Sequence, residues 1–212
     1  MNLGRFIALE GGEGMGKSTQ ARLLARALQD KGIAVELTRE PGGTPGAEAI
    51  RHLLLDPPGE GWQGEAEALL FAAARSDHVA RLIRPALDAG RWVVCDRFLD
   101  SSRAYQGVAG GLGDDRIRML HEIGSHGLLP DLTIVIEAAK SSVEARLADR
   151  DGDTSDAIGG RNARYHTAVN SAFLVFAEQE PDRFRVIDGM GSIEEVHARV
   201  MDAVSALLGD DR

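Results

Sequence analysis

The sequence predicts a single α/β domain in which a parallel β-sheet is covered by helices on both faces. Three observations support this fold class. Short apolar runs alternate with longer helical patterns, a glycine-rich loop separates the first run from the first helical pattern, and no repeat or low-complexity linker divides the 212 residues. Strands that alternate with helices need crossover connections, which place helices on both faces of a parallel sheet. A chain of this length can bury one sizeable core, so we expect one domain over residues 1–212.

The composition is typical of a globular protein and limits the partners that we expect. Hydrophobic residues make up 43% of the chain and charged residues 27%. The 33 acidic residues outnumber the 24 basic ones, for a net charge of −9, so we expect no nucleic-acid partner and only a locally basic site for phosphate. The single cysteine, Cys95, excludes an internal disulfide, and no apolar run approaches membrane-spanning length. We therefore expect a cytoplasmic protein that does not bind membranes.

The first strand, loop and helix predict a nucleotide-binding site. Phe6–Leu9 is an apolar run typical of a buried strand, and apolar residues recur at helical spacing from Leu23 until Gly32, a helix stop signal. Between them lies the pattern G-x-x-x-x-G-K-S of a P-loop, in which backbone N–H groups surround a phosphate. The lysine of this pattern reaches the β- and γ-phosphates, and the serine hydroxyl binds Mg²⁺. The predicted ATP-binding residues are Gly11, Gly12, Glu13, Gly14, Met15, Gly16, Lys17, Ser18 and Thr19.

The alternative interpretation of this stretch is a glycine-rich turn with an incidental lysine. It does not explain why a strand, a loop and a helix follow one another in the order that a P-loop requires. We therefore expect the protein to bind a nucleoside triphosphate.

Two elements precede a long central helix. Ile33–Leu37 predicts a second strand, and the proline and glycine residues of Thr38–Gly46 predict a rigid loop. Ala47–Leu55 predicts a short helix. A break rich in proline and glycine separates it from a long helix at about Glu65–Ala89.

The third strand is followed by a carboxylate. Trp92–Cys95 is an apolar run that ends at Asp96. At the C-terminal end of a strand in a P-loop protein, such a carboxylate helps to hold the metal ion, so Ser18 and Asp96 are the predicted metal ligands. We interpret Asp100–Gly107, which follows, as a loop.

The rest of the chain contains two more predicted strands and four helices. Residues 150–160 are polar and contain glycine, which is typical of a mobile loop. Apolar spacing and capping residues predict strands at Leu132–Ile136 and Phe184–Ile187, and helices at about Asp115–His126, Ser141–Asp149, Arg161–Gln179 and Ile193–Leu208.

Several motifs, taken together, resemble those of the bacterial thymidylate kinases. The resemblance covers roughly residues 5 to 190, and the motifs occur in the order of that family. It implies a P-loop fold with a five-stranded parallel sheet, transfer of the γ-phosphoryl group of ATP to dTMP with Mg²⁺, and a homodimer. Beside the P-loop, the motifs are Thr38-Arg39-Glu40-Pro41-Gly42-Gly43, Leu70-Phe71-Ala72-Ala73-Ala74-Arg75, Asp96-Arg97-Phe98, Asp100-Ser101-Ser102-Arg103-Ala104-Tyr105-Gln106-Gly107 and Pro130-Asp131-Leu132-Thr133.

The resemblance assigns roles at the dTMP site that agree with side-chain chemistry. Guanidinium groups bind phosphate oxygens in pairs, which suits Arg97 and Arg51 for the dTMP phosphate, with Arg39 as a further candidate. The sequence pattern alone assigns Phe71 to the core, but the resemblance implies that Phe71 stacks on the base. It also implies that Arg75, one helical turn further along, donates a hydrogen bond to the base. The predicted dTMP-binding residues are Glu13, Glu40, Arg51, Phe71, Arg75, Arg97, Ser102, Tyr105 and Gln106.

Two of these residues have more particular roles in the family. The P-loop pattern leaves the position of Glu13 free to vary, and the resemblance implies that its carboxylate reaches the 3′-hydroxyl of the acceptor sugar rather than solvent. Tyr105 is implied to crowd a 2′-hydroxyl, which suits a deoxynucleotide. Glu40 is implied to lie near phosphate or metal.

The predicted lid departs from the family. Bacterial members place a catalytic arginine in a lid, here about residues 147–163, usually within Asp-Arg, but this chain has Asp156-Ala157. Arg150 or Arg161 must then substitute, so the predicted catalytic residues are Lys17, Arg97, Glu13, Arg150 and Arg161. We predict that Arg150→Ala or Arg161→Ala lowers turnover and leaves dTMP binding nearly intact.

Three other functions remain as alternatives. Another P-loop nucleoside monophosphate kinase is disfavoured by the Phe71/Arg75 pair and the Ser102–Gln106 stretch. A GTPase switch usually contains Asn-Lys-x-Asp, and the three asparagines here are followed by Leu, Ala and Ser. A non-catalytic nucleotide-binding homologue is suggested only by Ala157. A methyl group contributes little free energy, so dUMP should be a poorer substrate than dTMP and not an excluded one.

Overall fold

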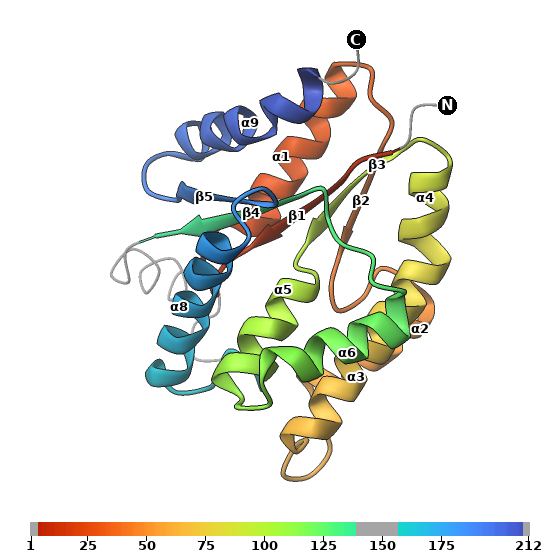
Figure 1. Cartoon of the computed structure of the whole chain (residues 1–212), viewed down its shortest axis with the longest axis vertical. Helices are drawn as coiled ribbons and strands as arrows, with labels where there is room; N and C mark the ends of the chain where they lie inside the picture. Colours follow the sequence, from red (N-terminus) through yellow and green to blue (C-terminus); the bar gives the residue numbers. More distant parts are fainter. Residues whose placement is uncertain (1–3, 139–156, 210–212) are drawn as a thin grey trace.

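The structure is a computed structural model that describes residues 4–138 and 157–209 (Figure 1). Its strands are β1 (Phe6–Glu10), β2 (Val35–Arg39), β3 (Trp92–Asp96), β4 (Leu132–Glu137) and β5 (Phe184–Asp188). Its helices are α1 (Lys17–Asp30), α2 (Pro45–Leu55), α3 (Gly64–His78), α4 (Arg84–Asp88), α5 (Leu99–Ser102), α6 (Asp114–Ser125), α8 (Ala163–Gln179) and α9 (Ile193–Gly209). Two π-helical segments, η1 (Val79–Ile83) and η2 (Arg103–Ala109), continue α3 and α5.

The five strands form one parallel sheet in the order β2-β3-β1-β4-β5. This confirms the predicted fold class. The chain leaves β1 for α1 and then crosses to β2, so the strand order reverses around β1 and β3. Ligands of such sheets bind beyond the carboxyl ends of the strands at this switch point. The P-loop follows β1 there, and Asp96 at the end of β3 is in register with Leu9.

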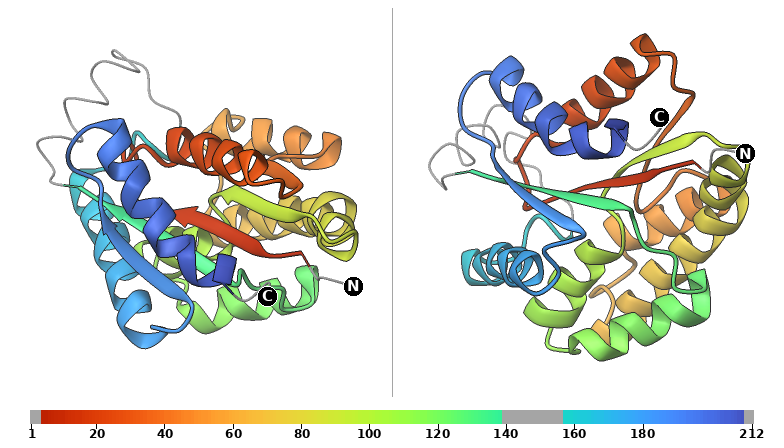
Figure 2. Two further views of the ribbon diagram at one scale, coloured as in Figure 1. Left: turned by 90° about the horizontal axis from the view of Figure 1, so that it is seen from above. Right: turned by 45° about the horizontal axis from the view of Figure 1, so that its top comes forward.

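Helices cover both faces of the sheet (Figure 2). On one face α1 and α9 pack against Ile7, Leu9 and Ile134, whereas Phe6 and Ala8 of the same β1 strand contribute to a second core on the other face. A third apolar cluster joins α8 to η2 and β4. Because both faces are covered, all five residues of β1 are buried, which explains its continuous apolar run.

Three helical segments follow one another where the sequence predicts one long helix at about 65–89. The prediction is confirmed in outline, since α3, η1 and α4 continue without a loop. The π-helical turn lies just before Pro85, which has no N–H to donate to the preceding turn. A wider turn at this point accommodates the interrupted hydrogen-bond ladder.

The prediction of a loop at 100–107 is wrong. This stretch is helical, as α5 and then η2. Its serines and glycine favour turns locally, but Arg103 is fully buried between Asp100 and Asp114, and these long-range contacts stabilise a helix that local preference does not predict.

The other predicted boundaries are close to the observed ones. The second strand is displaced by two residues, from 33–37 to 35–39, because its pairing with β3 runs from Val35 to Arg39. The predicted helix Ser141–Asp149 and most of the predicted mobile loop at 150–160 lie outside the described residues. Within the described part of the chain, no helix is sufficiently long and apolar to span a bilayer.

Candidate functional site

The P-loop has the backbone shape of an anion-binding loop. Gly11, Gly14 and Gly16 have φ angles of 134°, 69° and 84°, which L-amino acids with side chains rarely adopt. Gly16 is the N-cap of α1 and has no side chain to cap the helix, so the first N–H groups of α1 are left for a ligand. The Nζ of Lys17 donates to the carbonyl of Gly12 across the loop. Burial, followed by the nearby charge of Arg97, lowers the pKa of Lys17 to about 8.

Ser18 and Asp96 have the arrangement expected of a magnesium site. The Ser18 hydroxyl donates to Oδ2 of Asp96, which joins the start of α1 to the end of β3. The other carboxylate oxygen of Asp96, Oδ1, is buried and has no hydrogen-bond partner among the described residues. Mg²⁺ usually takes one or two protein oxygens and completes its coordination with water and substrate phosphates, so these two side chains fit it. No cluster of three or more carboxylate, histidine or cysteine ligands occurs among the residues that the structure describes.

A cavity of about 640 Å³ opens beside the P-loop. It brings together most of the residues that the sequence predicts for the two substrates, and adds several that it does not. The predicted residues in its lining are Glu13 to Thr19, Glu40, Arg51, Phe71, Asp96, Arg97, Ser102, Tyr105 and Gln106. Arg39, the further candidate for the phosphate, also lines the cavity, and the additional residues are Arg22, Pro41, Leu55, Ser101 and Ile158.

Arg97 is a cation of the lining that four hydrogen bonds hold in place. Its Nη2 donates to Glu13 Oε1 at 2.7 Å and to the Tyr105 hydroxyl at 3.3 Å, and its Nη1 donates to Gly11 O and Ser101 Oγ, both at 3.1 Å. Burial opposes its charge, but Tyr105 and then Glu13 hold the pKa of Arg97 above its ordinary value. Arg97 is therefore a permanent cation between the P-loop and η2.

The side chains around Arg97 form the rest of the predicted acceptor surface. Tyr105 packs under the guanidinium, with the Arg97 Cζ 5.1 Å from its ring centroid, and burial raises the pKa of its hydroxyl to about 12. Phe71 lines the cavity and also packs against the cluster between α8 and η2, so it belongs to both the lining and the core. Arg51 lies across the cavity, where its Nη1 donates to Pro41 O at 2.7 Å.

Arg75 lies beneath the cavity and not on its lining. Its Nε donates to Glu40 Oε2 at 2.7 Å, and its Nη2 donates to Ser102 Oγ at 2.9 Å and to Phe98 O at 3.1 Å. Glu40 also contacts His78 Nδ1 at 3.0 Å. Burial opposes the charge of Glu40, but Arg75 and His78 outweigh it and lower its pKa. The carboxylate of Glu40 is thus held by two buried partners at the edge of the cavity.

Arg161 is the one predicted lid cation within the described residues, since Arg150 lies outside them. It pairs with Glu67 Oε2 and lies over the ring of Tyr165, with its Cζ 4.6 Å from the ring centroid. The other oxygen of Glu67 accepts a hydrogen bond from Gln106 Nε2 at 2.8 Å. Arg161 is therefore linked through Glu67 to the acceptor side of the cavity in this structure.

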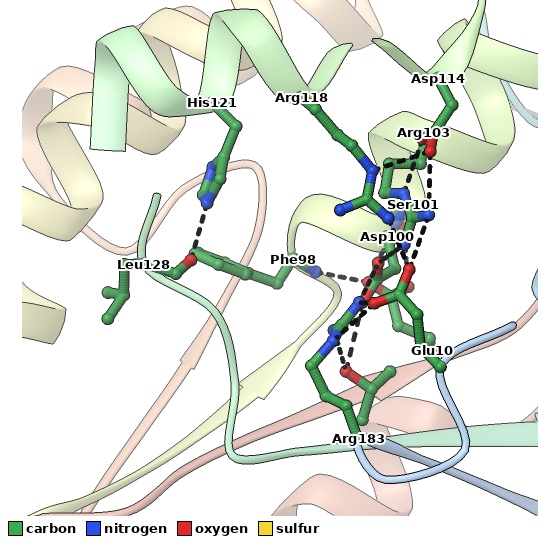
Figure 3. A network of polar contacts seen from close by, with 12 residues as sticks. Glu10, Phe98, Asp100, Ser101, Arg103, Asp114, Arg118, His121, Leu128 and Arg183 are labelled. Atoms are coloured by element: carbon green, nitrogen blue, oxygen red, sulfur yellow. Dashed lines mark hydrogen bonds and ion pairs between the residues drawn. The ribbon is translucent and has the colours of Figure 1, made fainter. Parts of the chain in front are cut away.

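Sequence reasoning missed the polar network behind the acceptor surface (Figure 3). Asp100 and Arg103 are fully buried, and Arg103 Nη1 donates to Asp100 Oδ1 at 2.7 Å. Arg183, from the segment before β5, donates to both oxygens of Asp100. Burial opposes the charge of Asp100, but Arg183 and then Arg103 lower its pKa. No local pattern predicts these contacts, because the partners are up to 83 residues apart.

Glu10 is the second omission. It is the last residue of β1 and is fully buried, although the predicted strand ends at Leu9. A charged residue directly after an apolar strand, at the carboxyl edge of the sheet, was the available signal. The same signal at the end of the third strand identified Asp96.

Comparison with known proteins gives one consistent result. The family described as "Thymidylate kinase" matches residues 9–200. Thymidylate kinases of Rhizorhabdus wittichii and Symbiobacterium thermophilum are 57% and 47% identical to this chain, and the alignments cover 97% and 96% of it and 99% and 94% of those proteins. The crystal structure of thymidylate kinase from Ehrlichia chaffeensis superposes with a TM-score of 0.78 at 31% identity, over 95% of this chain and 98% of that one. The chain belongs to the thymidylate kinase family.

Proposed function

We propose that the cavity between the P-loop and η2 is where this chain performs the reaction of its family. The chain is an ATP-dependent phosphotransferase that converts dTMP and ATP to dTDP and ADP, a step of nucleotide biosynthesis. This function is supported by the family match over residues 9–200 and by the convergence of the P-loop, Asp96 and Arg97 on one cavity. We further propose that the chain acts as one catalytic domain, with a lid at about residues 147–163.

The ATP side of the cavity is proposed to bind phosphates through backbone and side-chain groups. The N–H groups of the P-loop and of the first turn of α1 surround the β-phosphate, and Lys17 reaches the β- and γ-phosphates. Ser18 and Asp96 would hold Mg²⁺, which, when bound, neutralises charge on the transferring group. Because Lys17 and the bound Mg²⁺ would already neutralise the phosphate charges, the remaining task of the protein is mainly to align the two substrates.

The acceptor side is proposed to orient dTMP against the γ-phosphate. Arg97 and Arg51 bind the dTMP phosphate, and Phe71 stacks on the thymine ring. Glu13, which holds Arg97 at 2.7 Å, accepts from the 3′-hydroxyl of the sugar, and Tyr105 excludes a 2′-hydroxyl. Ser102, Gln106 and Glu40 complete the base and phosphate contacts, and Arg75 holds Glu40 and Ser102 in place from beneath the cavity.

The observation that carries the proposal is Arg97, a partly buried permanent cation on the same cavity as the P-loop. The test is ATP consumption by the purified protein with Mg²⁺ and each of dTMP, dUMP, dCMP, dGMP, dAMP and the ribonucleoside monophosphates. We expect strong preference for dTMP, weaker turnover of dUMP, and loss of activity in Lys17→Ala. Preference for another monophosphate would reject the acceptor assignments, and no turnover with any acceptor would favour a non-catalytic homologue.

We also propose that the protein is a cytoplasmic homodimer that associates through α3 and α6. These two helices pack side by side and expose three large apolar side chains, Leu69 at 56%, Met119 at 63% and Ile123 at 73%. An exposed apolar patch of this kind is typical of a protein interface. Light scattering after size-exclusion chromatography should give a dimer mass for the wild type and a monomer mass for Ile123→Asp. The matched control Val186→Asp, on β5, should remain dimeric, and a monomeric wild type would refute the proposal.

A further inference from the structure

We propose that Glu10 is a positioning residue for dTMP: through Ser101 it fixes the conformation of Arg97 that receives the acceptor phosphate. The inference rests on the proposed function, which assigns Arg97 to that phosphate. Glu10 itself does not line the cavity and belongs to none of the motifs by which the site was predicted. It is the last residue of β1, directly before the P-loop, and its carboxylate meets Phe98 and Ser101 at the start of α5 (Figure 3).

The carboxylate of Glu10 is buried and has an unusual set of partners. Its Oε1 accepts hydrogen bonds from the backbone N–H groups of Phe98 at 2.8 Å and Ser101 at 3.0 Å. Its Oε2 accepts from the Ser101 hydroxyl at 2.6 Å. No salt bridge to Glu10 is found within the described part of the chain, although burying an unpaired carboxylate is unfavourable. Because burying this carboxylate costs free energy of folding, its presence indicates a function that an apolar side chain at this position could not perform.

The first part of that role concerns the backbone of Arg97. Its φ angle is 68°, and it is one of two described non-glycine residues with a positive φ, a conformation that costs free energy and is retained where surrounding contacts enforce it. On one side of the peptide, Arg97 N donates to Leu9 O at 2.9 Å. On the other side, Glu10 holds Phe98 N and the N-terminal turn of α5. Two adjacent residues of β1 thus fix the turn at which Arg97 lies.

The second part concerns the guanidinium. The Ser101 hydroxyl donates its only proton to Glu10 Oε2, so its oxygen lone pairs are left for Arg97 Nη1, which approaches it at 3.1 Å. Glu10 therefore orients Ser101, and Ser101 orients Arg97. Glu13 holds the same guanidinium from the P-loop side, on the face where the substrate is proposed to bind. Arg97 is thus held from two sides, by Glu13 of the P-loop and by Ser101 of α5.

Glu10→Gln keeps the size of the side chain but changes its charge and its hydrogen bonding to Ser101. It therefore tests the relay from Glu10 through Ser101 to Arg97. The amide oxygen of glutamine can still accept from the two backbone N–H groups. Its NH₂ group, however, faces the Ser101 hydroxyl with a donor in place of an acceptor, so the hydroxyl must turn and present its proton elsewhere. We expect KM for dTMP to rise on the order of tenfold and KM for ATP to stay within about twofold, because one charge-assisted contact to the acceptor cation is misplaced.

Ser101→Ala tests the same relay without changing Glu10. Removing the hydroxyl should also raise KM for dTMP, and the double variant should be no worse than the more affected single variant, since both changes break one chain of contacts. The matched control is Asp131→Asn, which alters a carboxylate that accepts a hydrogen bond from the N–H of Phe6 at 2.7 Å, at the opposite end of β1 from Glu10. It should lower the melting temperature and leave KM for dTMP unchanged.

The outcomes separate this inference from the proposed function. Arg97→Ala must raise KM for dTMP; if it does not, the assignment of Arg97 to the acceptor is wrong. If Arg97→Ala raises KM but Glu10→Gln and Ser101→Ala leave it within about twofold of the wild type, the role of Glu10 is structural only. If the increases in KM for dTMP caused by Glu10→Gln and Ser101→Ala add up in the double variant, the relay is also overturned. If Glu10→Gln does not fold, Ser101→Ala alone decides, because an unchanged KM for dTMP in that variant rejects the proposal.

Discussion

At the scale of single residues, the buried carboxylates of this protein are of two kinds. Glu40 and Asp100 have arginine partners that overcome the effect of burial and lower the pKa of each carboxyl. Within residues 4–138 and 157–209, no arginine lies at hydrogen-bond distance from Glu10, and burial followed by the nearby charge of Asp100 raises its pKa to about 7. The first kind is ionised and paired at neutral pH, whereas the second changes its charge within the physiological range.

This difference predicts a pH-dependent stability difference between the wild type and Glu10→Gln. Folding raises the pKa of Glu10 from 4.5 to about 7, so the folded state favours its protonated form. That contribution to stability is fully present below about pH 4.5 and is lost as the pH rises through 7. Glutamine does not titrate, so Glu10→Gln should gain stability relative to the wild type with rising pH, on the order of 3 kcal/mol in total.

Urea unfolding of both proteins at pH 5, 6, 7 and 8 measures this difference. Other titrating groups are common to the two proteins and cancel in the comparison. A difference in unfolding free energy that stays constant over the range would mean that Glu10 keeps an ordinary pKa in the folded protein.

At the scale of elements, the sequence predicts the parts of the site whose signals are local. The P-loop and Asp96 were predicted correctly as neighbours because a short pattern and the end of an apolar strand each identify them. The helical state of Ser102–Gln106 was not predicted, since it depends on Arg103 reaching Asp100 and Asp114. The place of Arg75 beneath the cavity was likewise not predictable, because its partners Glu40 and Ser102 lie 35 and 27 residues away.

The lid and the start of α8 give a prediction about the catalytic cation. Arg150→Ala and Arg161→Ala should each lower turnover with KM for dTMP nearly unchanged. Loss of an arginine that stabilises the transferring phosphoryl group costs on the order of a thousandfold or more, so the double variant should show the larger effect. Arg164→Ala, an exposed arginine in the first turn of α8, three residues after Arg161, changes the charge equally and should keep wild-type turnover. Wild-type turnover in both single variants and in the double would remove the lid-arginine hypothesis.

Glu67→Gln distinguishes two ways in which Arg161 can act. In this structure Arg161 pairs with Glu67, so it must leave that carboxylate to reach a phosphate. If Arg161 acts on the phosphate, weakening the pair leaves turnover intact. In the other case, Arg161 acts only by holding Glu67 against Gln106. Arg161→Ala and Glu67→Gln would then both raise KM for dTMP.

At the scale of the whole molecule, one buried ionic network connects elements that are distant in the sequence. Asp100 of α5 contacts Arg103 of η2, Thr133 of β4 and Arg183 before β5, and Arg103 contacts Asp114 of α6. The guanidinium of Arg103 also lies 3.9 Å from the ring centroid of Phe176 on α8. The network therefore holds η2, which carries Tyr105 and Gln106, against both the sheet and its covering helices.

Replacing Arg103 tests how much of the fold depends on this network. Arg103→Met keeps much of the apolar stem but leaves Asp100 and Asp114 with one cation fewer, and removing one partner from a buried ion pair costs about 3–5 kcal/mol. We expect a loss of this size in the free energy of unfolding by urea. Arg118→Met removes a cation from Asp114 and Glu180 at the half-exposed rim of the same network, and should cost less than about 1 kcal/mol. Equal losses in the two variants would show that the network contributes through surface charge rather than through buried pairing, and η2 would then have to be held mainly by its apolar contacts with α8.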